Sequence, residues 1–376
     1  MGKFGKKNEI SLNPLDYNIC LLGIPKIGKT TILKEICEKL VGTDGYIHFD
    51  MGREDGADAI QGIVSEKIQD WNKLMEVVND ITENKESDYP DLKTIILDTL
   101  DEYILMAEKE SIRLYNRKNP DKRKETINEA WGGFGKGQDK AIDLMLDVIW
   151  KLKSVGVSTI VVGHVKRKDI TDPVTEETYS QLSADATQKY FKAIQNKMHF
   201  IGLAYIDREI VKEKNGKKNP VTHQEGVVNR VVSESRVISF RDDTYSIDSG
   251  SRFADIADKI PFDADEFIKA LQDAISKEQA KSGESLDKAK EKQAKREKEK
   301  EEKAKEASKN IKENKIDVEK NEELIETIKT AYIAMSNEDR DKFKAEMEKR
   351  SIESFGDAEA ISTKSLQELS DYISNL

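Results

Sequence analysis

Cysteine is scarce in this 376-residue sequence, which contains only Cys20 and Cys37. Two cysteines cannot build a disulfide framework, and no Cys-x-x-Cys pair or His/Cys cluster indicates a structural zinc site. The sequence also has no run of about 20 apolar residues, so it predicts no membrane span. These absences together predict a soluble protein of a reducing compartment, the cytoplasm.

Apolar residues are also few, at 37% of the chain, whereas charged residues reach 36%. Typical globular proteins have about 45–50% and about 25%, so the composition indicates a hydrophobic core diluted by a strongly solvated segment. The net charge of -10 excludes a wholly basic, histone-like DNA binder, although an acidic average can hide a basic patch. The basic start of the chain has no apolar stretch of a signal peptide, and Lys6 stands where a myristoylation signal needs Ser or Thr.

A basic tail over residues 1–16 precedes a predicted core over residues 17–262, where short apolar segments alternate with amphipathic ones. Residues 30–40 and 139–156 have the spacing of helices. Alternating strands and helices predict the α/β class, with a mainly parallel sheet covered on both faces. Residues 226–232 and 235–243 are expected to form an antiparallel hairpin or an edge extension. Five segments are predicted as buried strands: 17–23, 46–50, 94–98, 158–164 and 198–206.

Three segments follow this core. Residues 263–280 are predicted as a helix with Asp263 as its N-cap. Residues 281–315 are so rich in charge that they predict a solvated helical or disordered linker, without the apolar heptad positions of a coiled coil. Residues 316–376 regain helical periodicity and predict a small acidic helical module that binds a protein partner. Two pairs in it fit helix capping boxes: Ser336 with Asp339, and Ser365 with Glu368.

The strongest motif is a glycine-containing loop between the first predicted strand and helix, which matches GxxxxGK[ST] in full. In such a loop, backbone N–H groups surround phosphate oxygens, and the helix N-terminus adds a favourable partial charge. Lys29 is expected to reach the β- and γ-phosphates, and the Thr30 hydroxyl to ligate Mg²⁺. The candidate phosphate-binding residues are Gly23, Ile24, Pro25, Lys26, Ile27, Gly28, Lys29, Thr30 and Thr31.

A second motif is a buried strand that ends in a carboxylate. Residues 94–97 are the predicted strand, and Asp98 follows directly. An aspartate after a strand is weak evidence alone, but after a complete phosphate loop it predicts the carboxylate that holds Mg²⁺ through water. The two motifs together predict a site for ATP and Mg²⁺.

Hydrolysis also needs a group that orients or deprotonates the attacking water. Asp50 and Glu54 follow the strand at 46–50, and Glu102 follows Asp98. Glu54 is the favoured candidate, although each of these carboxylates could equally be a solvated loop residue. His164, at the predicted tip of the strand at 158–164, is a candidate to sense the γ-phosphate.

Two further segments suggest contact with nucleic acid. The loop at 131–137 has two aromatic residues, Trp131 and Phe134, among four glycines and Lys136. Such a loop can stack on bases and contact phosphate, or the aromatic rings can instead pack the loop onto the sheet. A basic triplet follows His164, and it could contact a DNA backbone, reach a neighbouring subunit's phosphate, or form a solvated turn. Its members are Lys166, Arg167 and Lys168.

With these motifs, residues 17–262 resemble the RecA-like P-loop ATPases, in particular the phage single-strand-annealing group of nucleotide-binding proteins. The resemblance rests on GIPKIGKTT, FDMGRED, TIILDTLDEY, WGGFGKG, VVGHVKRK and SRVISFRDDTYSIDSGSRF. It implies ATP binding, oligomerisation, single-stranded DNA as partner, and a strand inserted between those that carry the two nucleotide motifs. It also implies a catalytic glutamate two residues beyond Asp50, where this sequence has Gly52, so hydrolysis is expected to be slow or differently organised.

The sequence therefore leaves three functions open. The first is a P-loop ATPase, stimulated by DNA, that promotes annealing or strand pairing on single-stranded DNA in phage recombination. The second is a nucleotide-gated loader or scaffold with little turnover, working through residues 316–376. The third, a small-molecule kinase, would need a lid and an acceptor pocket, of which the sequence gives no sign.

Overall fold

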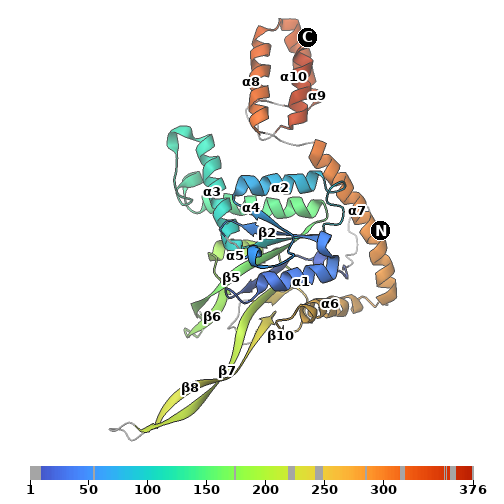
Figure 1. Cartoon of the computed structure of the whole chain (residues 1–376). Coiled ribbons are helices and arrows are strands. Elements are labelled where there is room, and N and C mark those ends of the chain that lie inside the picture. Colours follow the sequence, from blue (N-terminus) through green and yellow to red (C-terminus); the bar gives the residue numbers. More distant parts are fainter. Residues whose placement is uncertain are drawn as a thin grey trace.

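The computed structural model describes residues 10–53, 56–172, 175–218, 225–241, 249–283, 286–313, 318–350, 352, 354–355 and 361–374. Ten strands of this described chain form one sheet, with helices on both of its faces and a helical bundle at the C-terminal end (Figure 1). None of the described helices is long and apolar enough to cross a membrane.

The centre of the sheet is parallel, and its strand order identifies the architecture. Strand β5 lies between β1 and β4 and is parallel to both, which confirms the inserted strand that the resemblance implies. Two strands lie off the main path: β6 (Thr178–Ala184) pairs with β5, and β9 (Gly250–Ser251) with β7. Along the main path the order is β10 (Lys259–Pro261), β8 (Glu225–Ser239), β7 (Phe200–Lys218), β1 (Ile19–Gly23), β5 (Ser158–Thr171), β4 (Thr94–Asp98), β2 (Tyr46–Met51) and β3 (Ser65–Ile68).

Helices cover both faces because the buried strands alternate side chains between two hydrophobic clusters. In β1, Cys20 and Leu22 belong to one cluster, and Ile19 and Leu21 to the other. The first cluster packs under α2 (Trp71–Glu83), α3 (Leu100–Lys118), α4 (Lys136–Ser154) and α5 (Gln188–Gln195), and the second under α1 (Lys29–Val41) and α6 (Ala264–Ala280). Short 3-10 helices occupy Pro14–Asp16, Thr43–Gly45, Ala57–Ala59, Pro120–Lys122 and Ala130–Gly132. The predicted α/β class with a mainly parallel sheet is confirmed.

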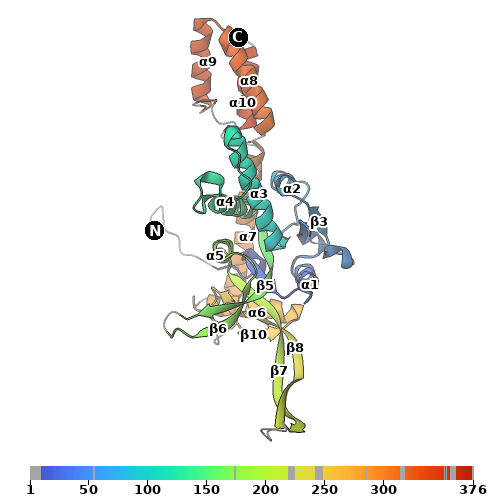
Figure 2. The ribbon, with the colours of Figure 1, turned by 90° about the vertical axis from the view of Figure 1, so that its left-hand side faces the viewer.

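Two strand predictions need correction. The strand predicted at 158–164 continues as β5 to Thr171, because its outer half pairs with β6 in an antiparallel hairpin. The segments at 226–232 and 235–243 do not form a hairpin with each other, since residues 225–239 form the single strand β8, which instead extends the sheet towards its edge. The antiparallel partner of β8 is β7, and the resulting long hairpin projects from the sheet (Figure 2). Strand pairing of this kind depends on distant partners, which local sequence patterns do not specify.

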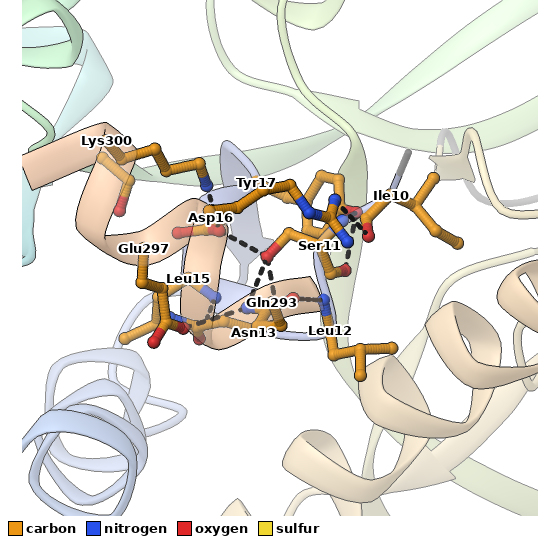
Figure 3. A network of polar contacts seen from close by, with 12 residues as sticks. Ile10, Ser11, Leu12, Asn13, Leu15, Asp16, Tyr17, Gln293, Glu297 and Lys300 are labelled. Carbon is orange, nitrogen blue, oxygen red and sulfur yellow. Dashed lines mark hydrogen bonds and ion pairs between the residues drawn. The ribbon is translucent and has the colours of Figure 1, made fainter. Parts of the chain in front are cut away.

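The highly charged segment forms a single helix, α7 (Leu286–Glu313), that contacts the core through polar groups. The Ser308 hydroxyl donates hydrogen bonds to the carbonyl oxygen of Thr82 at 2.7 Å and to that of Glu83 at 3.1 Å. Nearer its beginning, α7 holds the N-terminal segment (Figure 3): the Leu12 N–H donates to Gln293 Oε1 at 2.7 Å, and Lys300 pairs with Asp16. These polar contacts, together with Ala307 and Ile311, which pack against the first hydrophobic cluster, dock a helix that has few apolar residues.

The helices α8 (Val318–Ala334), α9 (Asn337–Lys349) and α10 (Thr363–Ser374) enclose a hydrophobic cluster of their own. The Ser336 hydroxyl accepts a hydrogen bond from the Asp339 N–H, as the capping-box pattern predicts. The second predicted box is wrong, because α10 begins earlier. There the Ser362 hydroxyl accepts from the Ser365 N–H at 3.1 Å, so Ser362 is the cap and Ser365 is already helical.

A histidine at the start of β7 gives the fold a predicted pH dependence. The Asn18 N–H donates to His199 Nδ1 at 3.1 Å, and burial, with the nearby charges of Arg252 and Lys153, lowers the pKa of His199 to about 4. Below its ordinary pKa of about 6.5, the unfolded chain binds a proton that the folded chain refuses, so stability falls as the pH drops from 6.5 towards 4. We expect His199→Gln to flatten the fall of the melting temperature across this range. Parallel curves for both proteins would contradict this assignment.

Candidate nucleotide site

The predicted phosphate loop lies at the carboxyl end of the central strand, between β1 and α1. Gly28 has a φ of 105°, a left-handed conformation that glycine adopts without strain, and it forms the N-cap of α1. Gly23 needs its small size, because an added Cβ would lie 3.0 Å from both Cβ and the carbonyl oxygen of Ala204 in β7. The loop therefore presents backbone N–H groups at a helix N-terminus, the arrangement that binds phosphate.

Lys29 is buried inside this loop, with an exposed fraction of 6%. Its Nζ donates hydrogen bonds to the carbonyl oxygens of Gly23 and Ile24, both at 3.1 Å. A neutral carbonyl oxygen binds an ammonium group less strongly than a phosphate oxygen does, because it has no full negative charge. The ammonium group is thus positioned to exchange them for phosphate oxygens.

Thr30 and Asp98, 68 residues apart, are brought together at the edge of the loop. The Thr30 hydroxyl donates to Asp98 Oδ2 at 2.9 Å. His48 Nε2, from β2, contacts the same carboxylate oxygen at 3.1 Å. His48 was not predicted as a site residue, although its alternation with Asp50 along one strand places both side chains on the same face of the sheet.

The oxygen atoms at this edge are of the kind that Mg²⁺ prefers, a hydroxyl and a carboxylate. In the described part of the chain, no group of three or more His, Cys, Asp or Glu side chains could hold a metal alone. Thr30 and Asp98 therefore fit Mg²⁺ that is bound together with a nucleotide, since Mg²⁺ commonly takes one or two protein ligands and completes its sphere with phosphate and water.

The carboxylates predicted to activate water lie in different surroundings. Asp50 has an exposed fraction of 3% and pairs with Lys67 at 3.1 Å, and burial raises its pKa. Glu54 lies outside the described residues. Glu102 lies in the first turn of α3, beside Gly52.

His164 is the direct neighbour of the phosphate loop, because it pairs in register with Gly23. Its Nδ1 lies 3.2 Å from Asp101 Oδ2, in the first turn of α3. The prediction that it stands at the tip of a strand is wrong in one respect, since β5 continues for seven residues beyond it.

Two further residues reach the loop from the far end of the core, and the sequence analysis did not predict either as a site residue. Arg236 in β8 donates from Nη1 to the carbonyl oxygen of Ile27 at 3.3 Å. Its guanidinium group lies over the ring of Phe262, 5.7 Å from the centroid, and that ring also borders Gly28. No sequence motif marks this contact, because it depends on the pairing of β8 with β7.

The two aromatic residues of the loop at 131–137 have different environments. Trp131 Nε1 donates to the carbonyl oxygen of Ser111 at 3.1 Å, and its ring packs edge-on against Tyr115, so this side chain holds the loop onto α3. Phe134 is fully exposed. Both have positive φ angles, 61° and 51°, which side-chain-bearing residues rarely adopt. Lys136 is exposed at the first position of α4.

The basic triplet lies in β5, so its members alternate between the two faces of the hairpin. Lys166 pairs with Asp185, and Lys168 donates to the carbonyl oxygen of Ala184 at 2.8 Å. Arg167 is exposed on the opposite face. The triplet therefore does not form one continuous basic patch.

Comparison with known families gives one match. A family model described as an AAA domain matches residues 15–253, which include the phosphate loop, Asp98, His164 and Arg236. No curated protein matches the chain. The matched domain indicates nucleotide binding and hydrolysis by a P-loop ATPase-like fold, with Mg²⁺ as the usual metal.

Proposed function

Because the chain belongs to the AAA domain family, we propose that it is an ATPase that binds ATP and Mg²⁺ through its phosphate loop and acts on single-stranded DNA. The observation that carries the nucleotide part is the Thr30–Asp98 hydrogen bond of 2.9 Å beside the buried Lys29. At the N-terminus of α1 there are thus a hydroxyl and a carboxylate that can bind Mg²⁺ and an ammonium group that can bind phosphate. A complex of Mg²⁺ with a nucleoside triphosphate requires these groups.

The chain's own residues would act as follows. Lys29 would leave the carbonyl oxygens of Gly23 and Ile24 and donate to the β- and γ-phosphates. Thr30 and Asp98 would hold Mg²⁺, and His48 keeps the Asp98 carboxylate oriented through its 3.1 Å contact. When bound, Mg²⁺ neutralises the charge that develops on the transferred phosphoryl group.

The proposed coupling to DNA follows from a shared strand. Strand β5 holds His164 beside Gly23 and continues three residues later to the exposed Arg167 in the β5–β6 hairpin. A change in the phosphates contacted at the loop would thus act on the strand that carries a candidate DNA contact. ATP would stabilise the DNA-binding form, and hydrolysis would release it, because only the triphosphate has γ-phosphate contacts.

Single-stranded DNA is the favoured partner because the loop at 131–137 presents a fully exposed aromatic ring, Phe134, beside the exposed Lys136. Stacking on an aromatic ring is tolerant of base sequence, which suits annealing or strand pairing in phage recombination in the host cytoplasm. We further propose that the protein forms homo-oligomers with the nucleotide near subunit contacts.

Replacing Phe134 with alanine should weaken binding to single-stranded DNA by about 5- to 150-fold, because stacking contributes about 1–3 kcal/mol per base. Fluorescence anisotropy of a labelled oligonucleotide, with ATP at low salt, measures the effect. Trp150→Ala is the matched control, since Trp150 is a half-exposed aromatic on α4, the helix that follows the loop. Equal affinities for all three proteins would exclude Phe134 as a DNA contact.

The ATPase rate with and without single-stranded DNA tests the function as a whole. We expect stimulation of the wild-type protein by DNA and no turnover by Lys29→Ala. Negligible DNA affinity at low salt, equal with and without ATP, would contradict the DNA part of the proposal.

A nucleotide-gated loader or scaffold with little turnover is the second candidate. The separate hydrophobic cluster of α8, α9 and α10 favours it, because such a bundle offers a surface for a protein partner. Capture of a partner through residues 316–376, without DNA-stimulated ATPase activity, would support this function over the first.

A further inference from the structure

Gly52, just beyond β2, has no side chain, and the space that its side chain would take is filled by Glu102. Gly52 has a φ of 66°, and a Cβ added to it would overlap Glu102 Oε2 and lie 2.6 Å from the carboxyl carbon. The Glu102 carboxyl group thus stands where a side chain at position 52 would stand. A carboxylate of helix α3 therefore lies at the carboxyl end of strand β2.

This carboxylate lies at the nucleotide edge of the sheet. Asp50 in β2 pairs in register with Asp98 in β4, and Glu102 lies in the first turn of α3, the helix that directly follows β4. Two glycines that follow β2 lie near residues of this edge. Gly52 borders Glu102, and a Cβ on Gly56 would lie 3.9 Å from Thr30 Oγ1.

The Glu102 carboxylate is also not used in a helix-capping hydrogen bond. The sequence Thr99-Leu100-Asp101-Glu102 fits a capping box, in which the glutamate would bond back to the N-cap residue. Here Thr99 makes no side-chain cap, and its hydroxyl oxygen is buried without a hydrogen-bond partner. Within the described residues, Glu102 forms no hydrogen bond or ion pair.

The neighbouring carboxylates all have partners. Asp50 pairs with Lys67, Asp98 accepts from Thr30, and Asp101 lies 3.2 Å from His164 Nδ1. A group that accepts a proton from water needs a free lone pair, and among these four carboxylates Glu102 is the one without a hydrogen bond or ion pair to a described residue.

We propose that Glu102 is the catalytic carboxylate that orients and deprotonates the attacking water, an inference that rests on the proposed ATPase function. The water oxygen bonds to the γ-phosphorus as the bond from that phosphorus to the β–γ bridging oxygen breaks. ADP leaves with the electron pair of the broken bond, and the water proton passes to the Glu102 carboxylate and then to the phosphate product. Gly52 is glycine because a side chain there would displace Glu102.

Glu102→Gln tests the assignment, because it keeps the size of the side chain and removes the base. We expect single-turnover hydrolysis to fall by about 100-fold or more, the usual contribution of a general base. Affinity for a fluorescent ATP analogue with Mg²⁺ should stay within about threefold of wild type. Glu54→Gln tests the competing candidate. Glu86→Gln is the matched control, because Glu86 is an exposed glutamate in the connection between α2 and β4, and it should keep turnover within about threefold.

A second variant, Gly52→Ala, tests the same contact from the other side. The added methyl group overlaps Glu102 Oε2, so turnover should fall while nucleotide affinity persists. Circular dichroism melting verifies that this variant folds. A loss of turnover by Gly52→Ala without a loss of ATP affinity supports the proposal.

Three results would overturn the assignment: turnover by Glu102→Gln within threefold of wild type, loss of ATP affinity in parallel with turnover, or loss of turnover by Glu54→Gln alone. Failure of the ATPase proposal looks different, because the wild-type protein itself would then bind ATP without hydrolysing it, or not bind it at all. An active wild type with an active Glu102→Gln variant rejects only the role of Glu102.

Discussion

Replacing Lys29 with alanine is expected to weaken ATP binding by at least about 100-fold and to abolish measurable hydrolysis. The ammonium group is buried in the loop, where its Nζ contacts the carbonyl oxygens of Gly23 and Ile24. A hydrogen bond to a charged group contributes up to about 3 kcal/mol, and no other lysine or arginine in the loop itself is buried. Titration with a fluorescent ATP analogue, followed by a phosphate-release assay, measures both effects.

The matched control is Lys34→Ala, which removes a lysine from the same helix. Lys34 pairs with Glu38 at 2.9 Å, one turn along α1, and this pair lies away from the loop. We expect near wild-type affinity and turnover for this variant. Unchanged ATP affinity in Lys29→Ala would mean that the loop is not the phosphate site.

Asp98→Asn is expected to lower turnover by about 10- to 100-fold and to raise the Mg²⁺ concentration needed for activity. Residues that hold a metal through water or orient its ligands typically contribute this much to affinity or activity. The amide can still accept from the Thr30 hydroxyl, whose bond to Asp98 Oδ2 is 2.9 Å, so the local structure should persist while the negative charge is lost. Turnover at increasing Mg²⁺ concentration measures the shift.

Asp91→Asn is the control for Asp98→Asn, because Asp91 is an exposed carboxylate just before the same strand, β4. Its Mg²⁺ dependence should match that of the wild-type protein. If Asp98→Asn shows the same Mg²⁺ dependence as well, Asp98 does not hold the metal.

The sequence predicted that the phosphate loop and Asp98 lie at one edge of the sheet, because its signals are local. The loop from Gly23 to Thr31 is a continuous motif, and Asp98 directly follows a strongly apolar strand. The carboxyl ends of parallel strands lie at the same edge of a sheet. Two motifs that each follow a strand of a predicted α/β fold are therefore expected to lie close together. The Thr30–Asp98 contact is the result of that geometry.

The residues that the sequence left undecided depend on contacts between distant segments. Arg236 reaches Ile27 only because β8 pairs with β7, and His48 reaches Asp98 only because β2 lies beside β4. The choice among acidic residues likewise needed the contact of Gly52 with Glu102, which no spacing in the sequence encodes.

The docking of α7 was not predicted for a different reason. Hydrophobic periodicity identifies faces that pack through apolar side chains, and this helix has few of them. A few apolar side chains such as Ala307 and Ile311 pack against the core, and Ser308 on the end of α2 and Gln293 on the N-terminal segment add polar contacts. Neither kind of contact produces a periodic pattern in the sequence.

This docked helix determines how far the C-terminal bundle can reach. With 28 residues, α7 is about 42 Å long, and Ser308 fastens it to the body of the protein near its last turns. Only five Cα–Cα steps separate Glu313 from Val318, so these two ends of helices are at most about 19 Å apart. The distance between the bundle and the body of the protein is therefore limited by a docked helix and a connection of few residues.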